Sequence, residues 1–221
     1  MDTRIDIQEC IKFGWRTFKA RPWFFIGAVA LVSVISIILK IPESSLPDDQ
    51  KLSFLAFAYG LLSMAVSILV DFAFKSLALT AHDNVGSARL ASLWRGDRVL
   101  PFIGASILVG IIVIVGLILL VIPGVIAAVA LVFATFLVLD KNMSPIEALK
   151  ESMRITKGRR LSIAGLLIVL GLLNILGFIL LAVGLLVTVP VSLIALVHAY
   201  RTLSAPVAAP AAVVADPVPA I

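Results

Sequence analysis

The chain has 221 residues, of which 61% are hydrophobic and 14% are charged, and its mean hydropathy is +1.14. A soluble domain carries about 25% charged residues, so this composition excludes a water-exposed surface over most of the molecule. The formal charge of +5 comes from basic residues that flank apolar segments, which favours anionic lipid headgroups over nucleic acid as a partner.

Residues 1–21 are mostly polar and basic, and they precede the first apolar run. No small-residue cleavage site follows that run, so we expect an uncleaved cytoplasmic segment rather than a signal peptide. Helical spacing places four residues on one face: Ile7, Ile11, Gly14 and Phe18. The basic residues that lean towards the polar side are Lys12, Arg16 and Lys19. This pattern predicts an amphipathic helix at the headgroup boundary.

Six membrane-spanning helices are expected within residues 22–203, because a span needs about 20 apolar residues. Two long stretches, Val99–Leu139 and Leu161–Tyr200, contain no Asp, Glu, Lys or Arg and are each about twice this length. Pro123-Gly124 breaks the first and Gly184 breaks the second, so each is predicted to be a helical hairpin. The expected spans are 23–39, 52–74, 101–122, 124–139, 161–182 and 185–200.

The fourth and sixth expected spans are short, at about 24 Å each. Re-entrant hairpins are therefore the open alternative to full crossings. Basic residues set the orientation, because all Lys and Arg except Lys40 and Lys51 fall on one side of six alternating spans. This asymmetry predicts a bacterial inner-membrane protein with both termini in the cytoplasm.

The two hairpins match at an offset of 61 residues and predict a parallel repeat with units at about 99–139 and 160–200. Three glycines of the first unit align with three of the second. They are Gly104, Gly110 and Gly116, which align with Gly165, Gly171 and Gly177. Their six-residue spacing points them in three directions, so they do not form a GxxxG stripe.

A stripe of small residues in the second span ends at an acid. Its members are Ala56, Gly60, Ser63, Ser67 and Asp71. Asp71 precedes Lys75 by four residues, the favourable order for an ion pair on a helix. Asp71, Lys75 and Asn174 are the candidate polar residues within the membrane, either as contacts between helices or as part of a transport path. Asn174 lies near the middle of the fifth span.

Residues 144–158 predict a second amphipathic helix. Ser144, Pro145 and Glu147 form a helix start with a capping box, and Gly158 is placed to end the helix. Its basic face and the residues after it are candidate headgroup contacts, as is the face of the N-terminal helix. The additional candidates are Lys150, Arg154, Lys157, Arg159 and Arg160. Residues 204–221, rich in Ala, Val and Pro, predict a disordered cytoplasmic tail.

No pattern typical of a catalytic or metal site occurs. Cys10 is the only cysteine, and His82 and His198 lie far apart along the chain. The nucleotide-binding, zinc-protease and serine-hydrolase motifs do not occur. We therefore expect no catalytic residue, no metal, no cofactor and no enzymatic activity.

The segment Ile122–Gly158 resembles a widespread group of bacterial polytopic membrane proteins. The residues that carry the resemblance are Ile122-Pro123-Gly124, Val138-Leu139-Asp140 and the run from Ser144 to Gly158, in which Met153 stands where the group often has Trp. The group includes uncharacterised integral membrane proteins and the membrane domain of some glycerophosphodiester phosphodiesterases. The similarity covers most of the chain up to about residue 203. It implies a fold and a location but no catalytic residues, and no soluble phosphodiesterase domain is present in the 221 residues.

The leading hypothesis is a non-enzymatic membrane protein with a role in membrane homeostasis or as a scaffold. The alternative is a small transporter or channel that uses the Asp71 stripe and the twin hairpins. The expected partners are the bilayer and anionic headgroups, and either a second copy of the chain or another membrane protein is left open. Nucleic acid is not expected, because no motif for reading it occurs.

Overall fold

The computed structural model describes residues 6–40, 52–83, 96–180 and 184–204, and all regular structure in these ranges is helical. The helices are α1 (Ile7–Ala20), α2 (Pro22–Lys40), α3 (Leu52–Asp83), α4 (Gly96–Leu119), α5 (Val121–Leu131), α6 (Ala134–Lys141), α7 (Pro145–Thr156), α8 (Arg160–Ile179) and α9 (Leu185–Ser204). The all-α prediction is thus confirmed for the described residues. The expected disordered tail lies outside them from residue 205 onwards.

Within the described ranges, five segments are long and apolar enough to cross a membrane. They are Gly60–Asp83, Gly96–Leu119, Val121–Lys141, Arg160–Ile179 and Leu185–Ser204. The apolar segment Pro22–Leu31 of α2 is shorter than these five segments. The chain therefore has the elements of a multi-pass membrane protein.

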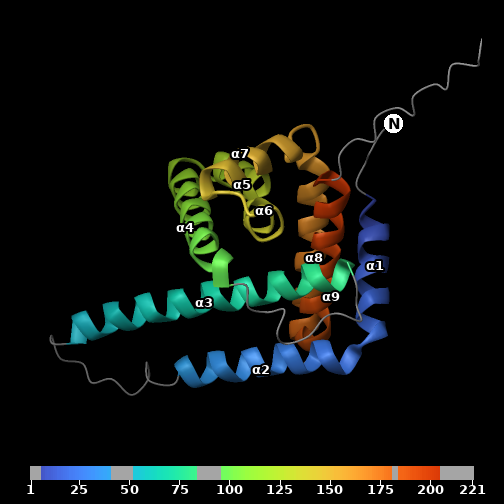
Figure 1. Ribbon diagram of the computed structural model, residues 1–221, viewed down its shortest axis with the longest axis horizontal. Coiled ribbons are helices and arrows are strands. Elements are labelled where there is room, and N and C mark those ends of the chain that lie inside the picture. Colours follow the sequence, from blue (N-terminus) through green and yellow to red (C-terminus); the bar gives the residue numbers. More distant parts are fainter. Residues whose placement is uncertain (1–5, 41–51, 84–95, 181–183, 205–221) are drawn as a thin grey trace, which may run out of the picture.

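The helices form hairpins that do not share one direction. In Figure 1, α2 and α3 run side by side and cross α1, α8 and α9 at a steep angle. The helices α4 and α5 pack against each other as a second hairpin, and α8 and α9 form a third. The α2–α3 and α8–α9 hairpins thus splay apart from a shared centre.

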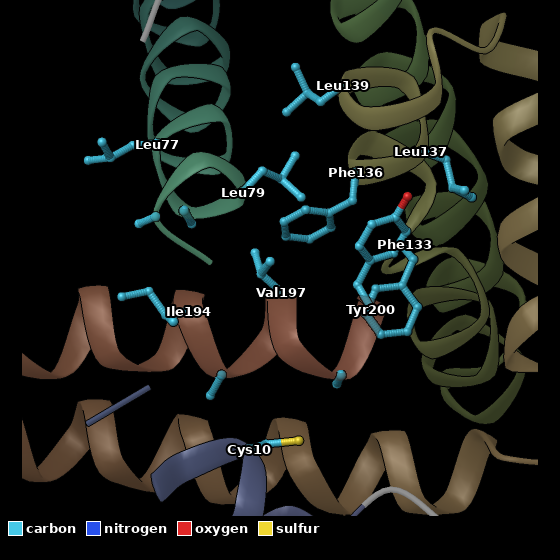
Figure 2. Close-up of a cluster of buried hydrophobic side chains, with 14 of the residues drawn as sticks. Cys10, Leu77, Leu79, Phe133, Phe136, Leu137, Leu139, Ile194, Val197 and Tyr200 are labelled. Atoms are coloured by element: carbon cyan, nitrogen blue, oxygen red, sulfur yellow. The ribbon is translucent and has the colours of Figure 1, made fainter. Parts of the chain in front are cut away.

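That centre is built from the C-terminal part of α3, from α6 and from α9. Figure 2 shows Leu79 of α3, Phe136 of α6 and Val197 of α9 pointing towards one another. The ring of Tyr200 stacks on Phe136, with centroids 5.7 Å apart, and also contacts Phe133. Close packing of these large side chains joins segments from all three hairpins.

The turn between α4 and α5 differs from the sequence prediction. The helices are separated at Leu120, whose backbone is extended, and not at Pro123-Gly124. Pro123 lies in the first turn of α5, where its missing N–H costs no hydrogen bond. Gly124 allows close approach to α4, because a Cβ atom there would lie 2.5 Å from the backbone nitrogen of Leu117. The break therefore comes three residues earlier than predicted.

The second hairpin is bent inside its returning arm, where α5 ends and α6 begins at Val132 and Phe133. The break frees the carbonyl of Ala130 from regular helix geometry. Ser152 Oγ donates to this carbonyl at 2.8 Å and Thr156 Oγ1 at 3.3 Å. Two buried hydroxyls of α7 thus satisfy a buried acceptor that lipid could not.

The predicted start of α7 is confirmed. The backbone N–H of Glu147 donates to Ser144 Oγ, and the backbone N–H of Ser144 donates to the Glu147 carboxylate at 3.1 Å. These bonds hold the pKa of Glu147 below its usual value. Gly158 has a φ of +81°, the left-handed conformation expected after a helix end.

The first helices of the three hairpins share one pattern of burial. Near the start of each lies a large apolar residue that is 84%, 80% or 88% exposed: Trp23, Leu100 and Leu161. Two residues later each has a buried apolar residue, namely Phe25, Phe102 and Ile163. Three residues further on, each helix has a second buried apolar residue: Ala28, Ala105 and Leu166. The residue directly before this second buried residue is a glycine in each helix: Gly27, Gly104 and Gly165.

The packing between hairpins follows the same order. Helix α4 packs against α3, and α8 packs against α5, so each contacts the returning arm of the preceding hairpin. Helix α2 closes the circle, because it packs against α9, the returning arm of the last hairpin.

Candidate functional site

The predicted ion pair between Asp71 and Lys75 is confirmed, and it lies where three helices meet. Lys75 Nζ of α3 donates to Asp71 Oδ2 at 2.7 Å and to Thr135 Oγ1 of α6 at 3.0 Å. The same ammonium lies 5.6 Å from the ring centroid of Phe102 on α4 and 5.4 Å from that of Phe136. A carboxylate, a hydroxyl and two aromatic faces therefore satisfy one cation.

The described part of the small-residue stripe, Gly60, Ser63 and Ser67, is exposed or partly exposed. Ser63 Oγ donates to the carbonyl of Gly60, and Ser67 Oγ donates to that of Ser63, so both bonds stay within α3. Among the described atoms outside the neighbouring helix backbone, none lies within 4 Å of a Cβ built on Gly60. The structure does not join the stripe to Asn174, which lies in a different hairpin.

Asn174 connects the two arms of the α8–α9 hairpin. Its Nδ2 donates to Ser192 Oγ at 3.2 Å, which fits the predicted contact between helices. The Oδ1 of Asn174 and the Oγ1 of Thr188 are buried and have no hydrogen-bond partner among the described residues. Both oxygen atoms belong to this one hairpin.

A polar network that the sequence did not predict is centred on Asp140 at the end of α6. Asp140 Oδ2 accepts hydrogen bonds from Tyr200 Oη at 2.8 Å and from Arg201 Nη1 at 2.9 Å. Arg201 also pairs with Asp83 of α3 at 2.6 Å. Arg98 of α4 donates to the backbone carbonyls of Leu139 and Asp140. The network thus joins the ends of four helices.

One sequence signal could have found this network. Asp140 and Arg201 are 61 residues apart, the same offset that relates the glycines of the two hairpins. The corresponding positions at the ends of the two repeat units therefore carry opposite charges, and this pattern could have predicted an ion pair between them.

Two histidines that the sequence separates by 116 residues lie together. His82 Nε2 is 3.2 Å from His198 Nδ1, so the N–H of one ring donates a hydrogen bond to the nitrogen of the other. The ring of Phe13 on α1 stacks on His198, with centroids 4.4 Å apart. Within the described ranges, no group of three His, Cys, Asp or Glu side chains could hold a metal ion.

The basic residues of α1 and α7 are exposed. They are Lys12, Arg16 and Lys19 on α1 and Lys150, Arg154 and Lys157 at α7. Arg154 forms an ion pair with Glu151 at 2.6 Å, which lowers the pKa of Glu151. Arg160 is exposed as well, whereas Arg159 is partly buried.

The apolar face of α1 packs against α9, whereas the sequence pattern predicted only that this helix lies at the headgroup boundary. A Cβ on Gly14 would lie 2.5 Å from the carbonyl oxygen of Val191, so the two backbones are in direct contact. Cys10 is 2% exposed, and its burial raises the pKa of the thiol to about 11. This face is structural and leaves the basic face free.

Residues 5–220 match a family model described as a domain of unknown function, DUF7847, and the chain belongs to this family. No curated protein and no solved structure matches the chain. The resemblance to membrane domains of glycerophosphodiester phosphodiesterases remains a prediction.

Proposed function

We propose that this member of a family of unknown function is a non-enzymatic scaffold of the bacterial inner membrane. It crosses the bilayer six times, with both termini in the cytoplasm, and its surface helices bind anionic headgroups. The observation that carries this proposal is that α1 and α7 have exposed cations and buried residues at corresponding positions.

The two surface helices correspond residue by residue at an offset of 138. Exposed cations occupy the same three positions in each: Lys12 and Lys150, Arg16 and Arg154, Lys19 and Lys157. Between them lies a large apolar side chain of equal exposure, Trp15 at 44% and Met153 at 42%. Cations beside a large apolar residue suit the boundary between headgroups and acyl chains.

The opposite faces correspond as well. Four matched pairs are buried: Cys10 and Ala148, Gly14 and Ser152, Thr17 and Ile155, Phe18 and Thr156. Helix α7 packs on the α4–α5–α6 hairpin, and α1 packs on the α8–α9 hairpin. Each surface helix therefore covers a hairpin and turns its cations outward.

Six spans and an internal repeat are part of the proposal. The glycines that align at an offset of 61 have matching surroundings: Gly110 and Gly171 are open, and Gly116 and Gly177 face Gly124 and Gly184 across their hairpins. The burial pattern of α2 extends this match, so we infer three hairpin units where the sequence indicated two. Three splayed hairpins would place their exposed apolar ends in lipid.

A scaffold role accounts for the polar residues. Asp71, Lys75 and Asp140 each bond to side chains of their own or neighbouring helices, and these bonds hold the hairpins together. The alternative is a small transporter or channel that uses Asp71 and the twin hairpins.

The test combines topology with flux. Cysteines introduced at Pro123 and at the exposed Leu180, in a Cys10→Ala background, are expected to react with an impermeant maleimide only from the periplasmic side. Proton and potassium flux into vesicles that contain the purified protein is expected to equal that of empty vesicles. Flux that disappears in Asp71→Asn would establish the transporter, and labelling of both sites from the cytoplasm would disprove six spans.

The headgroup contact has its own test. Vesicles with phosphatidylglycerol are expected to raise the melting temperature of the protein above its value in phosphatidylcholine, because a ligand of the folded state stabilises it. Replacing Lys12, Arg16 and Lys19 with Gln should reduce this increase, with Lys141→Gln as the exposed control. An unchanged increase would refute the role of α1.

A further inference from the structure

An open groove of about 340 Å³ lies between α5 and α8. The residues that line it are Val125, Ile126, Val129, Arg160, Leu161 and Ala164. All of them except Arg160 are apolar, so the groove offers an apolar channel with a single cation. Its volume is within the range of ligand pockets, roughly 300–1,000 Å³.

Arg160 is the first residue of α8, and its side chain is exposed. Its guanidinium has no ion-pair partner among the described residues. A guanidinium presents paired N–H donors that match two oxygen atoms of a phosphate. The unpaired cation therefore complements a phosphate group next to an apolar channel.

A comparison of the three hairpins explains why this groove is open. The position of Ala164 corresponds to Ile26 in α2 and Ile103 in α4, so α8 has a smaller side chain there. The position of Arg160 corresponds to Pro22 and Val99, so α8 carries a second arginine after the one that all three units share at Arg21, Arg98 and Arg159. The cation and the smaller side chain thus occur together in α8.

We propose that the α5–α8 groove binds one anionic phospholipid. An acyl chain lies along Val125, Val129 and Ala164, and the phosphate pairs with Arg160. This inference rests on the proposed insertion into the membrane and fits a re-entrant α4–α5 hairpin, because the groove brings Val125, near the turn of that hairpin, beside Arg160 at the start of α8. It adds a single built-in lipid site to the general headgroup contact of α1 and α7.

The test uses the full chain, reconstituted with equal amounts of phosphatidylglycerol and phosphatidylcholine and released gently for native mass spectrometry. The wild-type protein is expected to retain one phosphatidylglycerol molecule. Ala164→Ile restores the side chain of the sister helices and should abolish retention, whereas Ala164→Ser preserves the space and should not. Arg160→Gln should lower the preference for phosphatidylglycerol about fivefold, the value of one basic residue near an anionic lipid.

Controls separate the outcomes. Excess inorganic phosphate should leave the lipid in place, because the acyl chain contributes to binding; displacement by phosphate would show a free-anion site and overturn the proposal. Equal retention of both lipids by the wild-type protein, or unchanged retention in Arg160→Gln, would also overturn it. Extraction with alkaline carbonate reports insertion separately: a protein that is extracted contradicts the proposed function, and an inserted protein with no lipid preference contradicts only this inference.

Discussion

At the scale of single residues, a polar side chain in the core combines a partner on its own helix with a partner on another hairpin. Lys75 finds its carboxylate one helical turn away and its hydroxyl on another hairpin. Cys10 has no polar role and lies against α9 as a small apolar side chain. The residues that bear charge at the surface are therefore distinct from those that hold the core.

The first prediction concerns Cys10. Because its side chain is 2% exposed and its thiol pKa is about 11, little thiolate is present at pH 8. Maleimide labelling of the folded protein in detergent should be slow and should become fast in denaturant. Lys12→Cys in a Cys10→Ala background, on the exposed face of the same helix, should react rapidly when folded. Fast labelling of native Cys10 would contradict the packing of α1 on α9.

The second prediction concerns pH and the start of α7. The pKa of Glu147 is lower in the folded state than the unfolded value of about 4.3. Its stabilising effect is therefore complete above that unfolded value and is lost as the pH falls through the folded pKa. Hydrogen exchange of the α7 amides should increase as the pH is lowered through this range, after correction for intrinsic rates. In Glu147→Gln the step should be absent; a step of the same size would exclude the capping box as its cause.

At the scale of elements, the tight hairpins depend on glycine where two backbones touch. Gly124 and Leu117 are in direct contact, whereas Gly110 has open space around it. Both lie in or beside apolar helices of similar composition, so the two positions form a matched pair.

The third prediction uses this pair. Gly124→Ala should destabilise the protein by about 1–3 kcal/mol, the usual cost of an overpacked site. Gly110→Ala should be neutral or stabilise by up to about 1 kcal/mol, because Ala is the better helix former. The measurement is the free energy of unfolding in mixed micelles. Equal effects at both positions would mean that α4 and α5 do not meet at Gly124.

Local signals in the sequence were sufficient for some elements and not for others. Ser144, Pro145 and Glu147 lie within four residues, and they predicted the start of α7 correctly. Asp71 and Lys75 are one turn apart, and their pairing was predicted as well. Contacts over long sequence distances, such as the His82–His198 pair, depend on how the hairpins pack, and no local pattern contains that information.

The hairpin turn shows a second limit of sequence reasoning. Pro123 is the strongest breaker in its stretch, yet it fits the first turn of α5. The break at Leu120 depends on how closely Gly116 and Gly124 approach across the turn. The contact between α4 and α5 therefore determined where α5 begins, and the helix-breaking tendency of Pro123 did not.

At the scale of the whole molecule, Asp140 adds a polar link between hairpins that already share the packed centre of α3, α6 and α9. Tyr200 and Arg201 reach it from α9, and Arg201 extends the connection to Asp83 of α3. Because Asp140 is 18% exposed at its side chain, these charge-assisted bonds are only partly screened by water.

The fourth prediction follows from this position. Asp140→Asn should destabilise the fold by about 1.5–3 kcal/mol, the range for a hydrogen bond to a charged group. Hydrogen exchange should increase together in α3, α6 and α9. Arg154→Gln, which removes an exposed ion pair within α7, should affect only that helix. A response confined to α6 would contradict the proposed link between hairpins.

The single-residue turn at Leu120 has a consequence for biosynthesis. Between Arg98 and Asp140 the chain has no charged side chain, and α4 passes to α5 without a polar loop. In the proposed orientation, both arms can leave the translocon as one preformed pair, and no charged group has to be carried across the bilayer. The second hairpin would therefore insert without help from the membrane potential, and its integration should persist when that potential is collapsed.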